Sequence, residues 1–290
     1  SYNGLGATQL VYALFGVQYF YSKYSDYEDP FITKYEENES YTIYKLKDAL
    51  PIAYSIPEIF AKEVFVSKTT IAGSLDYQND IFKKLTGIDD LYTSVDTIKY
   101  EKTKTVTAGQ TGHYYMTVTG NAPEDLNLTK ENDTFTKTFS GLNKHNHIVD
   151  LGYLKEGESI NIDAELEMTA EIFVMDYNKL SEGISKLNNN SISLSNYTDT
   201  SIEGDINASG GSVLFTFAYD PGWTLYVDGV KTETYQVMGA LTGADVSDGT
   251  HHIFMEYKPT GFNVGLIVTL SSVALLAAIM IVKYKNPVLI

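Results

Sequence analysis

Apolar and polar residues alternate along much of the chain after residue 100, and this period of two is typical of β-strands with one buried face. In residues 114–120 (YYMTVTG), Met116 and Val118 alternate with threonines. Residues 158–166 (ESINIDAEL) alternate in the same way, whereas residues 171–177 (EIFVMDY) are apolar on both faces, as in a central strand. The pattern predicts a β-rich fold in this part of the chain.

Turn signals divide the last strands before the C-terminal helix. The Asp228-Gly229 pair between alternating residues predicts a hairpin with a type I′ turn, because both central residues of that turn need a positive φ. Asp248-Gly249 marks a second turn, and Pro259 is expected to end the last strand. The strands predicted around these turns are residues 211–220 (GSVLFTFAYD), 222–237 (GWTLYVDGVKTETYQV) and 250–259 (THHIFMEYKP).

Short strands and two helices complete the prediction. Residues 74–92 have Ile81, Phe82 and Leu85 on one helical face, with Gly87 as a C-cap, and residues 177–189 (YNKLSEGISKLNN) carry one apolar stripe. Short strands rich in tyrosine and β-branched residues are predicted at 17–22 (VQYFYS), 41–46 (YTIYKL) and 51–56 (PIAYSI).

Successive strands without crossover helices favour antiparallel pairing in a β-sandwich. We therefore predict a mainly β fold with some α-helix, organised in four parts along the chain. Residues 1–99 form a mixed α/β region and residues 100–260 an antiparallel β-sandwich-like region, both extracellular. A transmembrane helix at 261–283 and a cytoplasmic tail at 284–290 follow.

The predicted transmembrane helix rests on residues 262–282, which contain no charged side chain and are long enough to cross a hydrocarbon core of about 30 Å. Lys283 and Lys285 follow it, and the positive-inside rule then places the C-terminus in the cytoplasm and the bulk of the chain outside the cell. Since no export signal precedes Ser1, we expect this to be the C-terminal part of a longer membrane protein.

Composition excludes several functions. The 37 acidic residues outnumber the 21 basic ones, and the net charge of −16 argues against binding nucleic acid. Every basic residue is a lysine, so the bidentate phosphate recognition that arginine provides is absent. The chain has no cysteine, which excludes disulfides, thiolate metal sites and a cysteine nucleophile.

Four stretches resemble the C-terminal extracellular region of the YfhO family of bacterial membrane proteins. The most specific combines the Tyr-Asp-x-Gly-Trp turn, the Val-Asp-Gly hairpin, the Gly-x-His-His strand and the Tyr-x-Pro-x-Gly exit toward the membrane. The stretches are YTIYKLKDALPIAYSI, LDYQNDIFKKLTGIDDLY, VDLGYLKEGESINI and residues 217–265, which begin FAYDPGWTLYVDG.

This resemblance implies a polytopic glycosyltransferase of the GT-C type, which uses polyprenyl-phosphate-linked sugars outside the membrane to modify teichoic acid or other wall polymers. In such enzymes the catalytic residues lie near N-terminal membrane helices that this sequence does not contain. The resemblance therefore implies no catalytic residue and no cofactor in this segment. It implies an accessory extracellular part whose partners are the membrane and a wall glycopolymer or lipid-linked sugar.

An aromatic group near the hairpin is a candidate sugar-binding site. Tyr219, Trp223 and Tyr226 could stack on a pyranose, with Asp220 accepting hydrogen bonds from its hydroxyls. A tryptophan at the start of a strand more often buries its ring in the core, and for Trp223 we favour that alternative.

No metal site is expected. His145 and His147 would share one face of a strand, but no nearby residue completes a metal-binding pattern with them. His251 and His252 would point to opposite faces of a strand and so could not bind one metal ion together. Two other functions remain open, a membrane-anchored carbohydrate-binding or adhesion module and a structural envelope domain.

Overall fold

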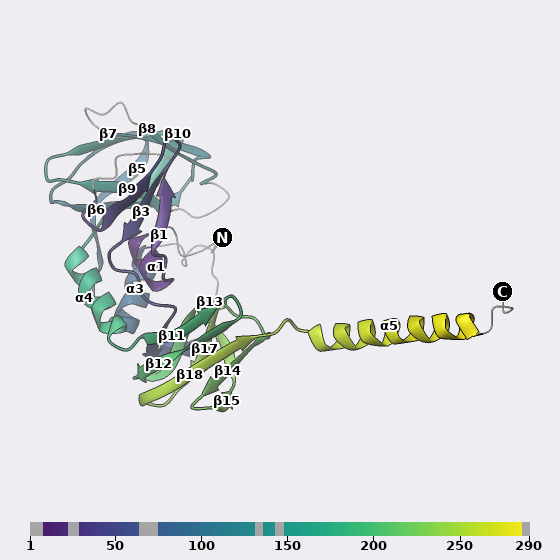
Figure 1. The fold of residues 1–290 in the computed structure, drawn as a ribbon. Coiled ribbons are helices and arrows are strands. Elements are labelled where there is room, and N and C mark those ends of the chain that lie inside the picture. The colour runs from purple at the N-terminus through teal and green to yellow at the C-terminus, as the bar shows by residue number, and fades with distance from the viewer. Residues whose placement is uncertain (1–7, 23–28, 64–74, 131–135, 143–147, 286–290) are drawn as a thin grey trace.

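A layer of helices lies between two β units in the computed structural model of the chain (Figure 1). The structure describes residues 8–22, 29–63, 75–130, 136–142 and 148–285. Within these ranges every paired strand is antiparallel, which confirms the predicted fold class.

The first β unit is one six-stranded sheet folded over its own core. Its longest strand, β10, pairs with β5 along most of its length, with β7 through its first half and with β6 through its second half. The two segments predicted as separate strands at 158–166 and 171–177 belong to this one strand, whose register shifts between Asp163 and Thr169. The strands are β5 (Tyr92–Thr107), β6 (Gly112–Gly120), β7 (Asp125–Lys130), β8 (Thr136–Ser140), β9 (Ile148–Leu154) and β10 (Ser159–Met175).

The core of this unit is built from the alternating apolar positions read in the sequence. Met116 and Val118 of β6 are buried there with Ile162 of β10 and Leu128 of β7. Since β10 reaches both halves of the sheet, its apolar side chains join the two halves into one core. The predicted domain division at residues 99 and 100 stays a prediction; residue 99 lies inside β5.

The second β unit is a sandwich of two sheets with a shared apolar core. One sheet has the order β11-β12-β18-β14-β15, from β11 (Ile192–Thr198), β12 (Ser201–Ala208), β18 (Gly249–Tyr257), β14 (Trp223–Val227) and β15 (Val230–Thr232). The other has the order β16-β17-β13-β4, from β16 (Thr234–Val237), β17 (Leu241–Asp245), β13 (Gly211–Ala218) and β4 (Ala53–Pro57). Because β4 comes from the N-terminal part of the chain, that part is built into the second unit.

The β14–β15 hairpin has the predicted geometry. Asp228 and Gly229 have φ angles of 52° and 77°, so both central residues adopt the positive φ of a type I′ turn. The strand predicted to continue through residue 237 instead leaves this sheet after β15, and its last part, β16, pairs with β17 in the opposite sheet.

The helices pack between the two β units and share a core with both. α3 (Leu75–Thr86) and α4 (Tyr177–Asn188) confirm the two predicted helices, although α3 ends earlier than residue 92 because Gly87 takes a φ of +75°. Asp176 caps α4 by accepting the Lys179 N–H. Two shorter helices, α1 (Gln9–Leu14) and α2 (Glu58–Ala61), join this layer.

A three-stranded sheet of order β1-β3-β2 lies beside α1. It consists of β1 (Tyr19–Ser22), β2 (Ile32–Glu37) and β3 (Thr42–Leu46), and its inner face buries Ile32, Tyr44 and Leu46. β1, β3 and β4 confirm the three short strands predicted from the sequence.

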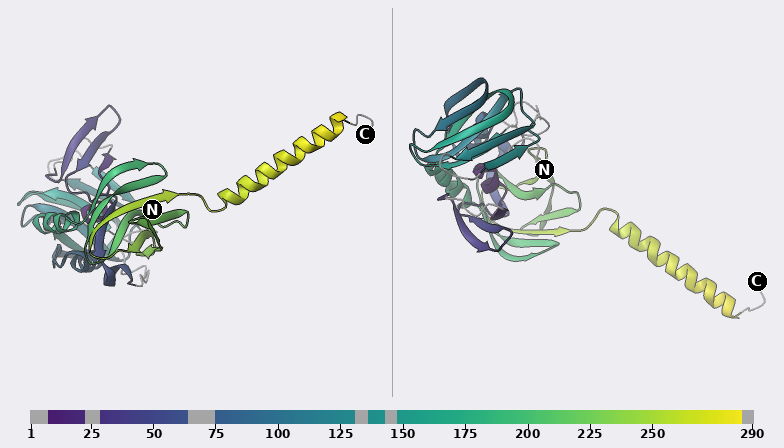
Figure 2. Two further views of the ribbon diagram at one scale, coloured as in Figure 1. Left: turned by 60° about the horizontal axis from the view of Figure 1, so that its bottom comes forward. Right: turned by 90° about the horizontal axis from the view of Figure 1, so that it is seen from above.

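The C-terminal helix α5 (Phe262–Lys285) projects away from both β units (Figures 1 and 2). It follows β18 after a short linker containing Pro259, and none of its residues is buried against the rest of the chain. Its 24 residues are long and apolar enough to cross a membrane, with a mean hydropathy of 2.5 over its most apolar window.

Gly183 allows α3 and α4 to pack closely. A Cβ at this position would lie 2.3 Å from the ring of Phe82, which is fully buried. We expect Gly183→Ala to destabilise the protein by about 1–3 kcal/mol through overpacking, although alanine is the better helix former. Chemical denaturation of the full chain in detergent measures this. The matched control is Ser185→Ala on the exposed face of α4, and equal stability of the two variants would contradict the close packing.

Candidate functional site

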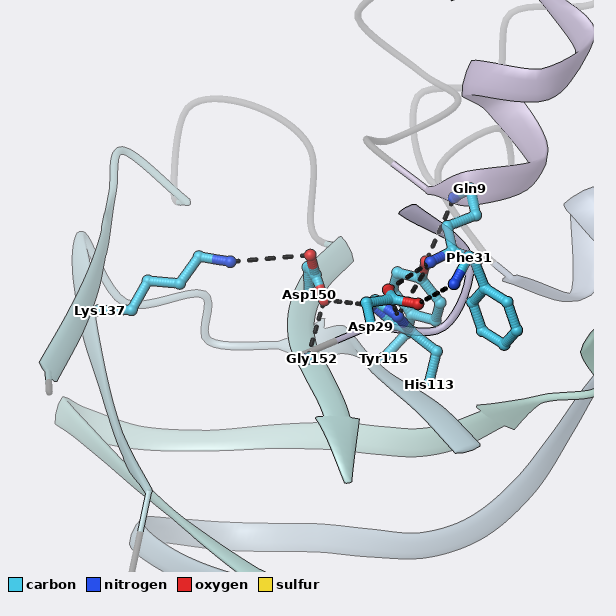
Figure 3. Close-up of polar contacts among 8 residues, drawn as sticks. All are labelled: Gln9, Asp29, Phe31, His113, Tyr115, Lys137, Asp150 and Gly152. Carbon is cyan, nitrogen blue, oxygen red and sulfur yellow. Dashed lines mark hydrogen bonds and ion pairs between the residues drawn. The ribbon is translucent and has the colours of Figure 1, made fainter. Parts of the chain in front are cut away.

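A buried histidine lies between two carboxylates where three parts of the chain meet (Figure 3). His113 begins β6, Asp150 lies in β9, and Asp29 belongs to the turn before β2. The His113 Nδ1 atom is 2.9 Å from Asp29 Oδ2, and Nε2 is 2.7 Å from Asp150 Oδ1. Only 3% of the His113 side chain and 4% of the Asp29 side chain are exposed, whereas 23% of the Asp150 side chain is, so the bridge meets water mainly at Asp150.

The two carboxylates keep His113 charged. Burial alone lowers the pKa of His113, but the charges of Asp150 and Asp29 and their hydrogen bonds outweigh burial and raise it to about 9. Burial likewise favours protonation of Asp150, yet the positive charges of His113 and Lys137 hold its pKa well below its usual range. At neutral pH the site therefore holds an imidazolium between Asp29 and the ionised Asp150.

Hydrogen bonds fix each member of the bridge. Asp29 Oδ1 accepts the Phe31 N–H at 2.9 Å, and Asp150 Oδ1 accepts the Gly152 N–H at 2.8 Å. Lys137 Nζ approaches Asp150 Oδ2 at 3.7 Å (Figure 3). All four carboxylate oxygens thus have a partner in the protein.

Gln9, at the start of α1, connects this bridge to the helix layer. Its Nε2 donates to Asp29 Oδ2 at 2.7 Å, and its backbone N–H donates to the Tyr115 hydroxyl at 3.2 Å. The Tyr115 ring stacks on the His113 ring with centroids 4.6 Å apart. Gln9 Oε1 is buried without a hydrogen-bond partner, an unusual condition for a polar atom inside a protein.

A pocket of about 300 Å³ opens beside this bridge. It is bordered by α1, the β1-β3-β2 sheet and strands β6, β8 and β9, so it lies between the N-terminal part of the chain and the first β unit. Its walls are Gln9, Tyr12, Phe20, Tyr21, Ser22, Asp29, Ile32, Leu46, His113, Tyr115, Lys137, Phe139 and Asp150.

The aromatic group predicted as a sugar site is placed differently. Trp223 is half-buried and packs on the core of the second β unit, with ring centroids 4.9 Å from Phe217 and 5.1 Å from Tyr257. Leu225, two residues further along β14, is fully buried on the same face. This placement agrees with the core alternative for Trp223.

The other three members do not form one surface with Trp223. Tyr226 lies on the opposite face of β14, where its ring is near Phe254 at 5.9 Å. Asp220 Oδ1 accepts the Gly222 N–H at 2.7 Å, and the Tyr219 N–H donates to the Ala240 carbonyl, so both residues shape the turn before β14. Sugar binding by this group stays a prediction that no contact in the structure supports.

Asp228 joins the β14–β15 hairpin to β18. Its Oδ1 accepts the His252 N–H at 2.8 Å, and its Oδ2 lies 2.7 Å from His251 Nδ1. Ser247 Oγ lies 3.1 Å from His251 Nε2, which gives the residue set of a Ser-His-Asp triad. The same Nε2 also lies 3.0 Å from the Ser247 carbonyl oxygen, so Ser247 contacts the ring through both its hydroxyl and its backbone. These contacts stabilise the turn before β18.

The histidines considered as metal ligands give no metal centre. His145 and His147 lie outside the described residues. His252 points away from His251, with Nδ1 2.9 Å from Asp205 and Nε2 3.3 Å from Glu203. Among the residues that the structure describes, no three His, Asp or Glu side chains gather so that they could hold a metal ion.

The sequence reasoning missed the bridge of His113, Asp29 and Asp150. The available signal was His113 itself, a histidine at the start of an apolar strand that is buried on both faces. Its two partners are 84 and 37 residues away in sequence, so no local spacing could have identified them.

Two antiparallel β units joined to one exposed apolar helix define a protein with a large folded part and a candidate membrane anchor. Residues 1–269 match the family described as bacterial membrane protein YfhO, and the chain belongs to this family. A comparison with curated proteins found no match.

Truncation of Trp223 tests its place in the core. We expect Trp223→Ala to destabilise the full chain by about 3 kcal/mol, the lower end for aromatic truncation, because the ring is half-buried. Tyr226→Ala, on the outer face of the same strand, should cost less than about 1 kcal/mol. Thermal and chemical denaturation in detergent measure both. Unchanged melting of Trp223→Ala together with lost sugar binding would reverse the assignment.

The charge of His113 makes stability depend on pH. Its pKa is about 9 in the folded chain against an ordinary 6.5, so its contribution is complete below pH 6.5 and is lost as pH rises through 9. That difference corresponds to on the order of 3 kcal/mol. Denaturation midpoints measured from pH 6.5 to 9 should fall for the native chain and stay nearly flat for His113→Gln. Parallel curves for the two proteins would refute the buried imidazolium.

Proposed function

We propose that this chain is a non-catalytic extracellular part of a polytopic membrane glycosyltransferase that transfers polyprenyl-phosphate-linked sugars to teichoic acid or another cell-wall polymer. The observation that carries the proposal is the YfhO family match over residues 1–269. In this proposal the chemistry belongs to membrane helices elsewhere in the protein, and the two β units face the wall.

The direction of the chain supports this orientation. β18 leads through a short linker directly into α5, so the β units lie at one end of the apolar helix and Lys283 and Lys285 at the other. Lysines prefer the cytoplasmic side of a membrane span. The strongly acidic β units are then placed outside the cell.

The chemistry of the bridge supports a non-catalytic role. A general acid in glycosyl transfer needs a carboxyl group that holds a proton near neutral pH. Asp150 has its pKa held well below the usual range by His113 and Lys137, and both oxygens of Asp29 are bound by groups of the protein. In this proposal these carboxylates therefore stabilise the fold and take no part in proton transfer.

A second candidate function is a membrane-anchored carbohydrate-binding module that acts without a transferase. The pocket beside His113 favours it, because a concave site that combines aromatic rings with polar groups can hold a small neutral ligand. The two candidates differ in whether wall polymers change when the protein is lost.

Deletion of the gene in the bacterium that encodes it tests the proposal. We expect wall polymers purified from the deletion strain to lose one class of sugar substituent, measured by NMR and sugar analysis, and the full-length gene to restore it. A plasmid lacking the codons for residues 8–257 should fail to restore it while the shortened protein still reaches the membrane, as checked by immunoblot. Unaltered sugar substituents in the deletion strain would overturn the transferase role and favour the binding module.

A further inference from the structure

Aromatic residues form a large part of the walls of the pocket beside His113. Five of them line it, from the four elements α1, β1, β6 and β8: Tyr12, Phe20, Tyr21, Tyr115 and Phe139. Phe20 stacks with Tyr12 at 6.4 Å and with Tyr44 at 5.4 Å, so this wall is held by other rings. Flat aromatic faces favour ligands that present C–H groups on a ring.

The polar part of the pocket is balanced in charge. Two carboxylates, Asp29 and Asp150, face two cations, His113 and Lys137. With no net charge at the site, and −16 on the chain, an anionic phosphate has no attraction here. The positive charges of His113 and Lys137 would likewise offset the attraction of the two carboxylates for a cationic ligand. The balance favours an uncharged ligand.

Gln9, one of the residues that line the pocket, has a polar atom without a hydrogen-bond partner. Gln9 is 6% exposed, and its Oε1 is a buried acceptor without a hydrogen bond. Gln9 Nε2 donates to Asp29 Oδ2 at 2.7 Å and also lies 3.1 Å from His113 Nδ1. A buried acceptor left unpaired costs free energy, and a ligand hydroxyl or N–H that donates to it removes that cost.

We propose that this pocket binds one uncharged saccharide unit, whose ring packs on the aromatic walls and whose hydroxyl donates to Gln9 Oε1. Its volume of about 300 Å³ is at the lower end of small-ligand pockets and so limits the bound portion to one sugar. The inference deepens the proposed function by giving the glycan a place on this chain, but it is tested on the protein alone.

Tyr21 links the pocket to an exposed tyrosine surface. It lines the pocket while 74% of it remains exposed, and its ring is 6.2 Å from that of Tyr41. On the same small sheet Tyr19 and Tyr35 pair at 5.0 Å, and both are also exposed. A longer glycan bound in the pocket would continue over these rings, so oligosaccharides should bind more tightly than single sugars.

Saturation-transfer NMR and calorimetry with the purified full chain test this binding, in a detergent without a sugar headgroup. The probes are the methyl glycosides of glucose, galactose and N-acetylglucosamine, their disaccharides, and inorganic phosphate as the anionic comparison. We expect at least one glycoside to bind in the millimolar range and phosphate not to compete with it.

Tyr21 offers a variant that does not threaten folding, because its side chain is mostly exposed. Tyr21→Ala should weaken saccharide binding about 5- to 10-fold, and Tyr21→Phe, which keeps the ring, should retain it. Tyr197→Ala is the matched control, since Tyr197 is 61% exposed on β11 of the other β unit, and it should bind as the native chain does.

Failure to bind any glycoside, binding unaffected by Tyr21→Ala, or displacement of the sugar by phosphate would each overturn the proposal. These outcomes are separate from the genetic result. If the protein binds a sugar but the deletion leaves wall polymers unchanged, the binding site is supported and the transferase role is contradicted. If the deletion alters wall polymers but the protein binds no sugar, the transferase role is supported and the binding site is contradicted.

Discussion

The buried charge of His113 is the constraint on which the arrangement of the first β unit and the N-terminal part depends. An imidazolium with 3% exposure is tolerable only because carboxylates from β9 and from the turn before β2 contact both ring nitrogens. Removing either partner would leave an uncompensated charge in the interior, which typically costs about 3–5 kcal/mol. The bridge therefore fixes where the turn at Asp29, and with it the β1-β3-β2 sheet, lies against β6.

The helix layer extends this constraint to the second β unit. Gln9 and Thr8 begin α1, and while Gln9 contacts the bridge, the Thr8 hydroxyl donates to Gln78 of α3 at 2.7 Å. α3 packs on α4 through Gly183, and the same core includes Tyr54 and Ile56 of β4, a strand of the second sandwich. The N-terminal part thus connects both β units, and Ala53 of β4 also joins the core of the second unit, whose other buried residues follow residue 191.

Periodicity and turn chemistry predicted the elements that depend on local sequence. The two helices, the type I′ turn at Asp228-Gly229 and the apolar helix α5 follow from spacing within a few residues. The pairing of β4 with β13 and the single strand β10 depend on contacts between distant residues, which one sequence does not reveal. The same is true of the site, because Asp29, His113 and Asp150 meet only once the chain is folded.

Histidine–aspartate contacts occur both at His113 and at the hairpin, where His251 contacts Asp228. Their surroundings explain why the candidate binding site lies at His113 and not at the hairpin. At the hairpin, both Asp228 oxygens bind groups of β18, and the half-buried Trp223 ring packs against Phe217 and Tyr257, so these side chains stabilise one turn and the core beside it. At His113 the same residue types border a pocket and leave Gln9 Oε1 unpaired. A residue that lines open volume and has an unpaired acceptor suits ligand binding, whereas a turn whose polar groups are all paired contributes stability.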